Sequence, residues 1–317
     1  MKRKDGLKIK GLNGFLRLGA LLVGENRTNV QNYYTQELLA RHMDEWIAEK
    51  NKHGMEYNYR DIAVATIVRL FYQRPELNRF IVKGNFYQRY FVDFGLVMHK
   101  NLRTGEKETV VKCRFTGKET IAEIKQKLDA TITNAISGTN ATDDIVDSFL
   151  GSLPNPLLRL FVWTLRLCDR WGMLSDKFMF EVSPFHSSAM FGDMKSVHLG
   201  PVWHHLYNFG NCGFFATMGK EQLKPVVDAK TGQTKSEKVI ELGITEDERF
   251  IDGLTYSHVM KSFERIISNL SVLETAPEAD DAKWPHAKTF KSKKAHDRFM
   301  RAFSKKQNKK FKKFAKN

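Results

Sequence analysis

The sequence predicts an α+β fold in which helices sandwich a mixed, mostly antiparallel sheet. Residues 61–72 are apolar almost all round, which is typical of a helix inside a domain. Residues 85–99 and 108–115 are rich in aromatic and β-branched side chains, and the turn-like residues 102–105 between them predict a hairpin. No glycine-rich phosphate loop follows a predicted strand, so the pattern does not favour a doubly wound parallel sheet.

The remaining elements follow from periodicity and turn signals. Apolar residues recur every three to four positions from Asn29 to Ile47, and this spacing predicts an amphipathic helix. Residues 1–28 contain an apolar patch at 18–23 and predict an arm or a first strand. Further helices are expected at 116–132, 157–180 and 254–273, strands at 212–218 and on both sides of the 229–232 turn, and a connection at 137–156.

The amino-acid composition excludes several classes of protein for this chain. The chain has 317 residues, 42% of them hydrophobic, so most of it folds. Its three cysteines are far apart, which excludes a disulfide framework and a zinc module of paired cysteines. No apolar run reaches the length of about 18 residues that spans a bilayer. We therefore expect a cytoplasmic protein without a metal site.

Positive charge is concentrated at the C-terminus. Lys and Arg exceed Asp and Glu by 51 to 36, a net charge of +15, and residues 288–317 alone hold 13 basic residues and one acid. Five phenylalanines alternate with these charges. The segment predicts a solvated extension, a contact with anionic lipid in which phenylalanines enter the interface, or a contact with nucleic-acid phosphates. We therefore divide the chain into an arm (1–28), a domain (29–275) and a basic tail (276–317).

One stretch carries the most specific chemical signal. Residues 242–254 form a strand, a tight turn and a helix, with Glu248 followed four residues later by Asp252-Gly253. Two other blocks precede it, Arg74-Pro75-Glu76-Leu77-Asn78 and a strand that ends in Gly219-Lys220. In this order they resemble the chloramphenicol acetyltransferase-like superfamily, which includes the catalytic domain of dihydrolipoamide acyltransferases. The resemblance covers roughly residues 25–275. In the superfamily, the strand that corresponds to the one before Glu248 ends in His-x-x-x-Asp-Gly.

The resemblance implies roles for individual residues. Glu248 takes the position of the histidine that acts as general base, while Asp252 and Gly253 shape the turn. The family pairs that aspartate with an arginine near the start of the domain, for which Arg27 is the candidate. The hydroxyl that donates to the oxyanion falls at Ser187 or Ser188 if Pro184-Phe185 anchors the alignment. If Gly192-Asp193-Met194 anchors it, a glycine stands there instead.

Glu248 in place of histidine leaves two hypotheses open. A carboxylate with a pKa near 4.3 is a weaker base than an imidazole near 6.5, although burial can raise it. Either Glu248 or a channel histidine acts as the base, or the fold is catalytically inactive and serves binding or assembly. The candidate histidines are His186, His204, His205 and His258. His204 and His205 are adjacent on a predicted strand and face opposite ways, so one metal ion could not easily take both.

The resemblance also implies partners. The acyl donor would be free coenzyme A, since the residues before position 29 are too few for a lipoyl domain. The acceptor would be a small or lipid-like molecule, bound between the subunits of a homo-trimer. If the protein is inactive, residues 288–317 would bring it to an anionic membrane or a nucleic acid, with a peripheral membrane location in the first case.

Overall fold

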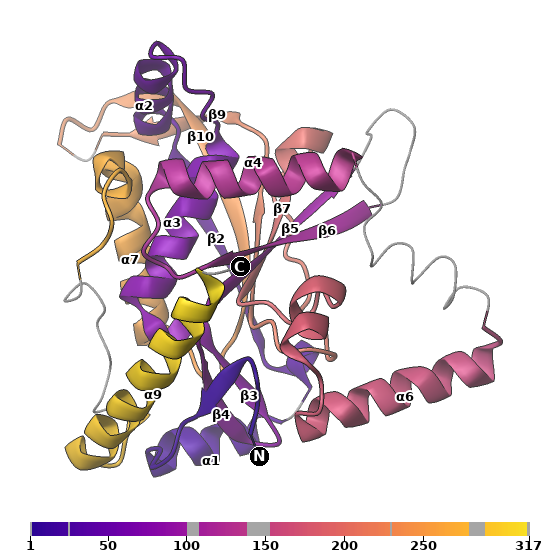
Figure 1. Cartoon of the computed structure of the whole chain (residues 1–317). Coiled ribbons are helices and arrows are strands. Elements are labelled where there is room, and N and C mark those ends of the chain that lie inside the picture. Colours follow the sequence, from indigo (N-terminus) through magenta and orange to yellow (C-terminus); the bar gives the residue numbers. More distant parts are fainter. Residues whose placement is uncertain are drawn as a thin grey trace.

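A mixed sheet organises the chain (Figure 1). The computed structural model describes residues 2–24, 26–99, 108–137, 153–228, 230–278 and 289–315. The strand order is β2-β10-β8-β7-β5-β6, and β9 pairs with β10. The central β7 runs parallel to β5 and β8, while the other pairs are antiparallel, which confirms the predicted α+β class. The strands are β2 (Gln31–Leu39), β5 (Val92–His99), β6 (Glu108–Phe115), β7 (Ala189–Asp193), β8 (Phe214–Met218), β9 (Gln222–Val227) and β10 (Thr234–Asp247).

A second, three-stranded sheet lies at the end of the molecule that carries the N-terminus (Figure 1). Its order is β1 (Gly6–Lys8), β4 (Asn85–Arg89) and β3 (Arg79–Val82). The β3 strand starts directly after a short 3-10 helix, Pro75–Asn78. This small sheet therefore joins the N-terminal arm to the segment that carries the Arg74–Asn78 motif.

Helices α3, α4 and α7 lie on one face of the main sheet (Figure 1). On the other face, Leu206 and Cys212 pack on Met190 and Phe215 of the sheet. Among the described residues, no helix is both long and apolar enough to cross a membrane. The helices are α1 (Gly14–Leu22), α2 (Arg41–Asn51), α3 (Tyr59–Gln73), α4 (Ile121–Ser137), α6 (Asn155–Trp171), α7 (Gly253–Ser268) and α9 (Lys293–Phe314).

The most apolar predicted helix is the central one. Asn58 accepts a hydrogen bond from Asp61 N, and the Asp61 carboxylate accepts one from Asn58 N. This reciprocal capping box fixes the start of α3. Residues 61–71 are then buried on all sides, between the sheet and the flanking helices α4 and α7.

The helix predicted from Asn29 to Ile47 is wrong in its first half. Residues 31–39 form β2, which pairs with β10 over nine positions from Gln31↔Asp247 to Leu39↔Val239. Apolar residues at Val30, Tyr34 and Leu38 are four apart, and positions four apart share a face of a strand as well as of a helix. The long pairing with β10 therefore decides the conformation, and the helix begins only at Arg41.

Other predicted elements are confirmed with shifted ends. Residues 92–99 and 108–115 pair as an antiparallel hairpin, whereas the turn expected at 102–105 lies outside the described residues. Most of the connection expected at 137–156 also lies outside them. The helix expected over 157–180 ends at Trp171, because Gly172 adopts a left-handed conformation (φ 69°) that closes the last turn.

The C-terminal basic segment is a helix docked on the body. The α9 helix starts at the cap residue Ser292, and its Phe299 and Phe303 side chains are buried. The Phe303 ring stacks on Tyr90, with ring centroids 5.7 Å apart. The expectation that these phenylalanines enter a lipid interface is therefore wrong for Phe299 and Phe303, which belong to the same core as the sheet.

Candidate active site

The turn between β10 and α7 carries Glu248. The backbone of β10 continues through Asp247 N, which donates to Gly213 O at 3.0 Å, and Glu248 N, which donates to Val30 O at 3.0 Å. These bonds hold Glu248 between the end of the sheet and the residue before β2. At the other end of the turn, Asp252 caps α7 by accepting a hydrogen bond from Thr255 N at 2.7 Å.

A buried ion pair holds this turn from inside. Arg249 donates to the carboxylate of Asp247, with Nε 2.8 Å from Oδ1, and both side chains are almost fully buried. A second guanidinium nitrogen of Arg249 donates to Gly24 O at 3.2 Å, just beyond α1. Glu248 lies between Asp247 and Arg249 in the chain, so the ion pair fixes the backbone on both sides of it.

Glu248 is half-buried and lines a cavity of about 550 Å³. The cavity unites the two motifs that the sequence singled out, since Glu76 and Arg79 line it together with the 248–253 turn. It is partly covered by α1, an element of the N-terminal arm. Apolar lining comes from Phe15, Leu16, Ala20, Val23, Phe250 and Ile251.

Arg79 also lines this cavity and directly follows the Arg74–Asn78 motif in the chain. Its side chain is buried, its Nε donates to Gln88 Oε1 at 3.3 Å, and its Nη2 has no hydrogen-bond partner among the described residues. Burial lowers the pKa of Arg79 to about 10, an effect that Glu76 opposes. Arg79 remains protonated at neutral pH, and its Nη2 is a buried donor that no described residue satisfies.

A second glutamate lies close in the chain to the candidate base. Burial raises the pKa of Glu246 to about 9, and the charges of Asp247, Glu248 and Asp252 act in the same direction. Glu246 is therefore protonated at neutral pH. The Tyr256 hydroxyl on α7 also has a raised pKa, because it is buried and near Glu246.

The two candidate oxyanion serines have other partners. Ser187 Oγ donates to Pro184 O at 2.9 Å, and Ser188 Oγ accepts from Asp93 N at 3.0 Å. Both side chains are buried, and neither lines the Glu248 cavity. The strand order β10-β8-β7 puts Ser188 and Asp247 at the same end of the sheet with β8 between them, a separation of roughly 10 Å.

Arg27 is buried near the site but donates to main-chain oxygens. It lies 2.7 Å from Tyr207 O through Nη1 and 2.5 Å from Gly210 O through Nη2. Burial lowers its pKa to about 10 while the Asp247 charge raises it. The Arg27 side chain thus ties the start of the domain to the 207–210 segment. Its proposed pairing with Asp252 stays a prediction.

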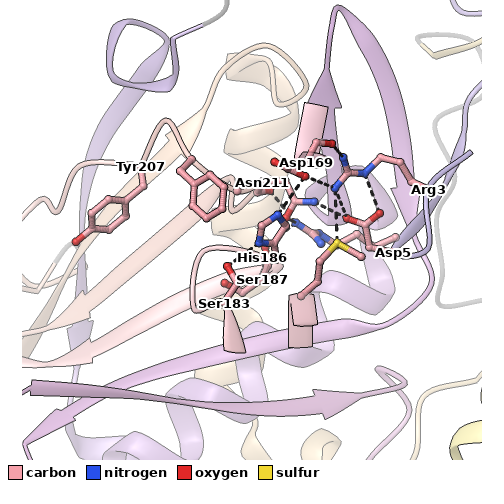
Figure 2. A network of polar contacts seen from close by, with 12 residues as sticks. Arg3, Asp5, Asp169, Ser183, His186, Ser187, Tyr207 and Asn211 are labelled. Atoms are coloured by element: carbon pink, nitrogen blue, oxygen red, sulfur yellow. Dashed lines mark hydrogen bonds and ion pairs between the residues drawn. The ribbon is translucent and has the colours of Figure 1, made fainter. Parts of the chain in front are cut away.

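His186 belongs to a buried polar network, shown in Figure 2. Its Nδ1 lies 2.7 Å from Ser183 Oγ, and its Nε2 lies 3.2 Å from Asp169 Oδ1. Burial lowers the pKa of His186, although Asp169 opposes this, so the ring is neutral at pH 7. Ser183 and His186 are both buried, and neither lines the Glu248 cavity.

The same network anchors the N-terminal arm to α6. Arg3 Nη2 donates to Asp169 Oδ1 at 2.8 Å, and Arg3 Nε donates to Asp5 Oδ1 at 2.9 Å (Figure 2). Burial would raise the pKa of Asp5, but the Arg3 guanidinium holds it below its usual range. We interpret this network as a structural connection between the arm and the last turn of α6.

The other candidate histidines lie away from Glu248's cavity. His204 stacks on Phe215 with ring centroids 4.2 Å apart, and on His205 at 4.6 Å. His258 is exposed on α7. Across the part of the chain that the structure describes, no group of three or more His, Cys, Asp or Glu could hold a metal ion.

Comparisons with known proteins identify the fold. No family model matches the chain, and no curated protein matches it in sequence. A probable dihydrolipoamide acetyltransferase from Listeria monocytogenes is similar in structure, with a TM-score of 0.54 and 10% identity over 80% of this chain and 88% of the other. The cubic core of the pyruvate dehydrogenase multienzyme complex gives a TM-score of 0.55, 10% identity, and coverage of 82% and 90%.

A third structure is the dihydrolipoamide acetyltransferase of Azotobacter vinelandii. It gives a TM-score of 0.51 and 11% identity over 81% of this chain and 87% of the other. The chain therefore has the chloramphenicol acetyltransferase-like fold of the acyltransferases, as the motifs predicted. Within this fold the Glu248 turn closes the last long strand of the main sheet.

Proposed function

We propose that the protein transfers an acyl group from coenzyme A to a small or lipid-like acceptor, with Glu248 as general base. The observation that carries the proposal is the position of Glu248 in a cavity beside an unpartnered donor of Arg79. In the Azotobacter enzyme, a serine, a histidine and an asparagine four residues after the histidine were investigated for their catalytic roles. Glu248 and Asp252 have the same spacing.

The residues support a defined sequence of steps. Glu248 removes the proton from the acceptor hydroxyl or thiol, and the resulting nucleophile attacks the thioester carbonyl. Rotation of the buried Arg79 side chain into the cavity would let its Nη2 donate to the oxygen that becomes negative in the tetrahedral intermediate. The carbon–sulfur bond then breaks, the coenzyme A thiolate leaves, and it takes the proton from Glu248. The products are the acylated acceptor and free thiol.

The cavity suits the acyl and thioester end of acyl-coenzyme A. Its apolar wall, with Leu16, Ala20 and Phe250, matches an acyl chain and the thioester arm. Its charged lining comprises two arginines, one of them paired with Asp247, and three carboxylic residues, so it offers no excess of positive charge to the phosphates. Coenzyme A, when bound, supplies the activated acyl group, and its phosphates would lie outside this cavity.

Thiol release from acetyl-coenzyme A with a panel of hydroxyl and thiol acceptors tests the proposal. Glu248→Ala should lower kcat by about 10² to 10⁴-fold, the range for loss of a general base. Glu248→His should retain activity and shift the acidic limb of the pH profile, where the general base becomes protonated, toward that of an imidazole. Arg79→Met should lower kcat by about 10² or more, since an oxyanion donor is lost.

Removal of an exposed carboxylate provides the matched control. Glu45 on α2 is exposed and distant from the cavity lining, so Glu45→Ala should release thiol at the wild-type rate. Unchanged activity in Glu248→Ala would remove Glu248 from the mechanism. If calorimetry detects no binding of coenzyme A, the proposal that coenzyme A is the acyl donor is refuted.

The assembly state is a separate part of the proposal. The resemblance implies a homo-trimer, and exposed apolar side chains such as Leu199, Val202 and Trp203 next to the sheet are suited to a subunit contact. Light scattering coupled to size-exclusion chromatography should give three times the mass of 36.6 kDa. A monomeric mass at all concentrations would refute the trimer.

A second candidate function rests on another cavity. A space of about 860 Å³ lies between α9 and the body. Its aromatic lining includes Phe91 and Phe180, while Asp176 and Glu181 are its acids. Its basic lining comprises Arg3, Lys4, Arg114, Lys177, Lys306, Lys309, Lys310 and Lys313. This composition supports an inactive binding protein that uses its basic C-terminal segment on nucleic-acid phosphates, with aromatic rings near the bases.

Fluorescence anisotropy with single-stranded RNA or DNA over a range of salt tests this alternative. Lys306→Glu with Lys309→Glu should weaken binding and reduce its salt dependence, because fewer counterions are released. Lys235→Glu, at the exposed start of β10, should have no such effect. Equal affinity in all three proteins would exclude α9 as the nucleic-acid surface.

A further inference from the structure

The α6 helix presents an apolar face that is largely exposed. Leu157, Leu160, Leu167 and Trp171 recur at spacings of three, seven and four, which places them on one side of the helix. Trp163 and Trp171 are 60% and 57% exposed. Figure 1 shows α6 extending away from the body, so the helix does not use this face to close the core.

The α1 helix adds a second apolar face at the same end of the molecule (Figure 1). Phe15 is 87% exposed and Leu22 76%, and Leu18 and Leu21 are also exposed. In an ordinary soluble helix such side chains face the core, whereas only Ala20 of α1 is fully buried.

The turn between β3 and β4 connects the two helices. Lys83 Nζ lies 3.2 Å from the centre of the Trp171 ring, at the end of α6. The neighbouring Gly84 has φ 63°, and a Cβ at this position would lie 2.7 Å from Leu21 Cδ2 of α1. The exposed faces of α1 and α6 and the Lys83–Gly84 turn therefore form one continuous area, which we name the α1–α6 surface.

The exposed charged residues of α1 and α6 within the described ranges are all basic. Arg159, Arg166 and Arg170 are exposed along the flank of α6, and Arg17 is exposed on α1. The α1 helix has no acidic residue, and the acid of α6, Asp169, is buried and paired with Arg3. Exposed apolar and tryptophan side chains beside a row of arginines are typical of a helix that lies in a membrane interface.

We propose that the α1–α6 surface binds an anionic lipid bilayer, with both helices lying in the plane of the interface. Apolar side chains enter the acyl boundary, and the arginines with Lys83 contact anionic headgroups. The exposed basic residues of the two helices match lipid phosphates and would repel a second copy of the same surface. The inference does not depend on catalysis by Glu248. It places a lipid surface near the arm that covers the Glu248 cavity.

Sedimentation of the full-length protein with lipid vesicles tests the proposal. Wild-type protein should bind vesicles of phosphatidylcholine mixed with phosphatidylserine and bind those of phosphatidylcholine alone far more weakly. Trp163→Glu with Phe15→Glu should lower the partition coefficient by about tenfold or more, since buried apolar area and charge both contribute. Arg159→Glu with Arg166→Glu should abolish the preference for phosphatidylserine.

Matched controls come from the opposite end of the molecule (Figure 1). Leu223 on β9 is 75% exposed, and Arg41 on α2 is also exposed, so Leu223→Glu and Arg41→Glu should bind vesicles as the wild type does. Equal loss in Leu223→Glu would overturn the assignment of the surface. Two results together would show that copies of the chain cover this face instead. The wild-type protein would not bind vesicles, and the Trp163→Glu variant would have a lower oligomeric mass than the wild type.

Discussion

Arg249 donates to both carboxylate oxygens of Asp247, and the residue between them in the chain is Glu248. Both partners are buried, so the pair is shielded from solvent and its geometry is fixed by the end of β10. Arg249 also reaches the main chain beyond α1 through Gly24 O. The position of Glu248 in its cavity therefore depends on the buried charge pair on either side of it in the chain.

Removal of one partner of this pair should destabilise the fold strongly. Asp247→Ala leaves a buried guanidinium without its carboxylate, which costs about 3–5 kcal/mol in the free energy of unfolding. The double variant Asp247→Ala Arg249→Met should cost less than the sum of the single variants, because no charge is left buried. Urea unfolding measures all three, and additive losses would show that the two side chains are energetically independent.

Glu246 should make stability depend on pH. The native pKa of about 9 exceeds the reference value of 4.5, so between these values the unfolded chain binds fewer protons than the native one. Stability conferred by the protonated group is complete below about pH 4.5 and is lost as pH rises toward 9, with a slope of up to about 1.4 kcal/mol per pH unit.

Replacement by the neutral isostere isolates this effect. Relative to Glu246→Gln, the wild type should lose stability steadily from about pH 4.5 to about pH 9 and change no further above it. Thermal unfolding of both proteins across this range measures the difference. Parallel stability curves would mean that Glu246 has the same protonation in the folded and unfolded chains.

Sequence patterns predicted the buried elements better than the peripheral ones. The central helix has a capping box and apolar residues all round, and both signals are local. The prediction for residues 31–39 was wrong because an apolar spacing of four fits both a helix and a strand. Only the pairing with β10, about 200 residues away in the chain, decides between the two conformations. The docking of α9 also depends on partners far away in sequence, such as Tyr90 and Phe91.

The site residues also differ in whether the sequence could identify them. Glu248 and Asp252 were identified from a local motif, and both line the same cavity. Arg79 was missed, although it directly follows the Arg74–Asn78 motif, because nothing in the chain indicates that its Nη2 lacks a partner. Glu246 was missed because its protonation depends on burial, and a strand glutamate without structural context is expected to be solvated.

Two glycines give opposite predictions for the same substitution. A Cβ at Gly213 would lie 2.4 Å from Phe250 Cζ, so Gly213→Ala should displace a ring that lines the Glu248 cavity and cost about 1–3 kcal/mol. In α1, a Cβ at Gly19 meets no atom within 4 Å, and Gly19→Ala should stabilise the helix by about 0.5–1 kcal/mol. Chemical unfolding distinguishes the two, and a loss in Gly19→Ala would contradict the open space around that position.

The C-terminal helix should behave as part of the core. Phe303 is 2% exposed and stacks between Tyr90 and Phe299, with ring centroids 5.7 Å and 5.6 Å away, so Phe303→Ala should cost about 3–5 kcal/mol. Phe15→Ala removes the same side chain from an exposed position and should leave the unfolding midpoint nearly unchanged. Limited proteolysis adds an independent measurement, because α9 should resist cleavage in the wild type and become sensitive in Phe303→Ala. Cleavage of α9 at equal rates in both proteins, with equal unfolding midpoints, would show that the basic segment is a solvated extension.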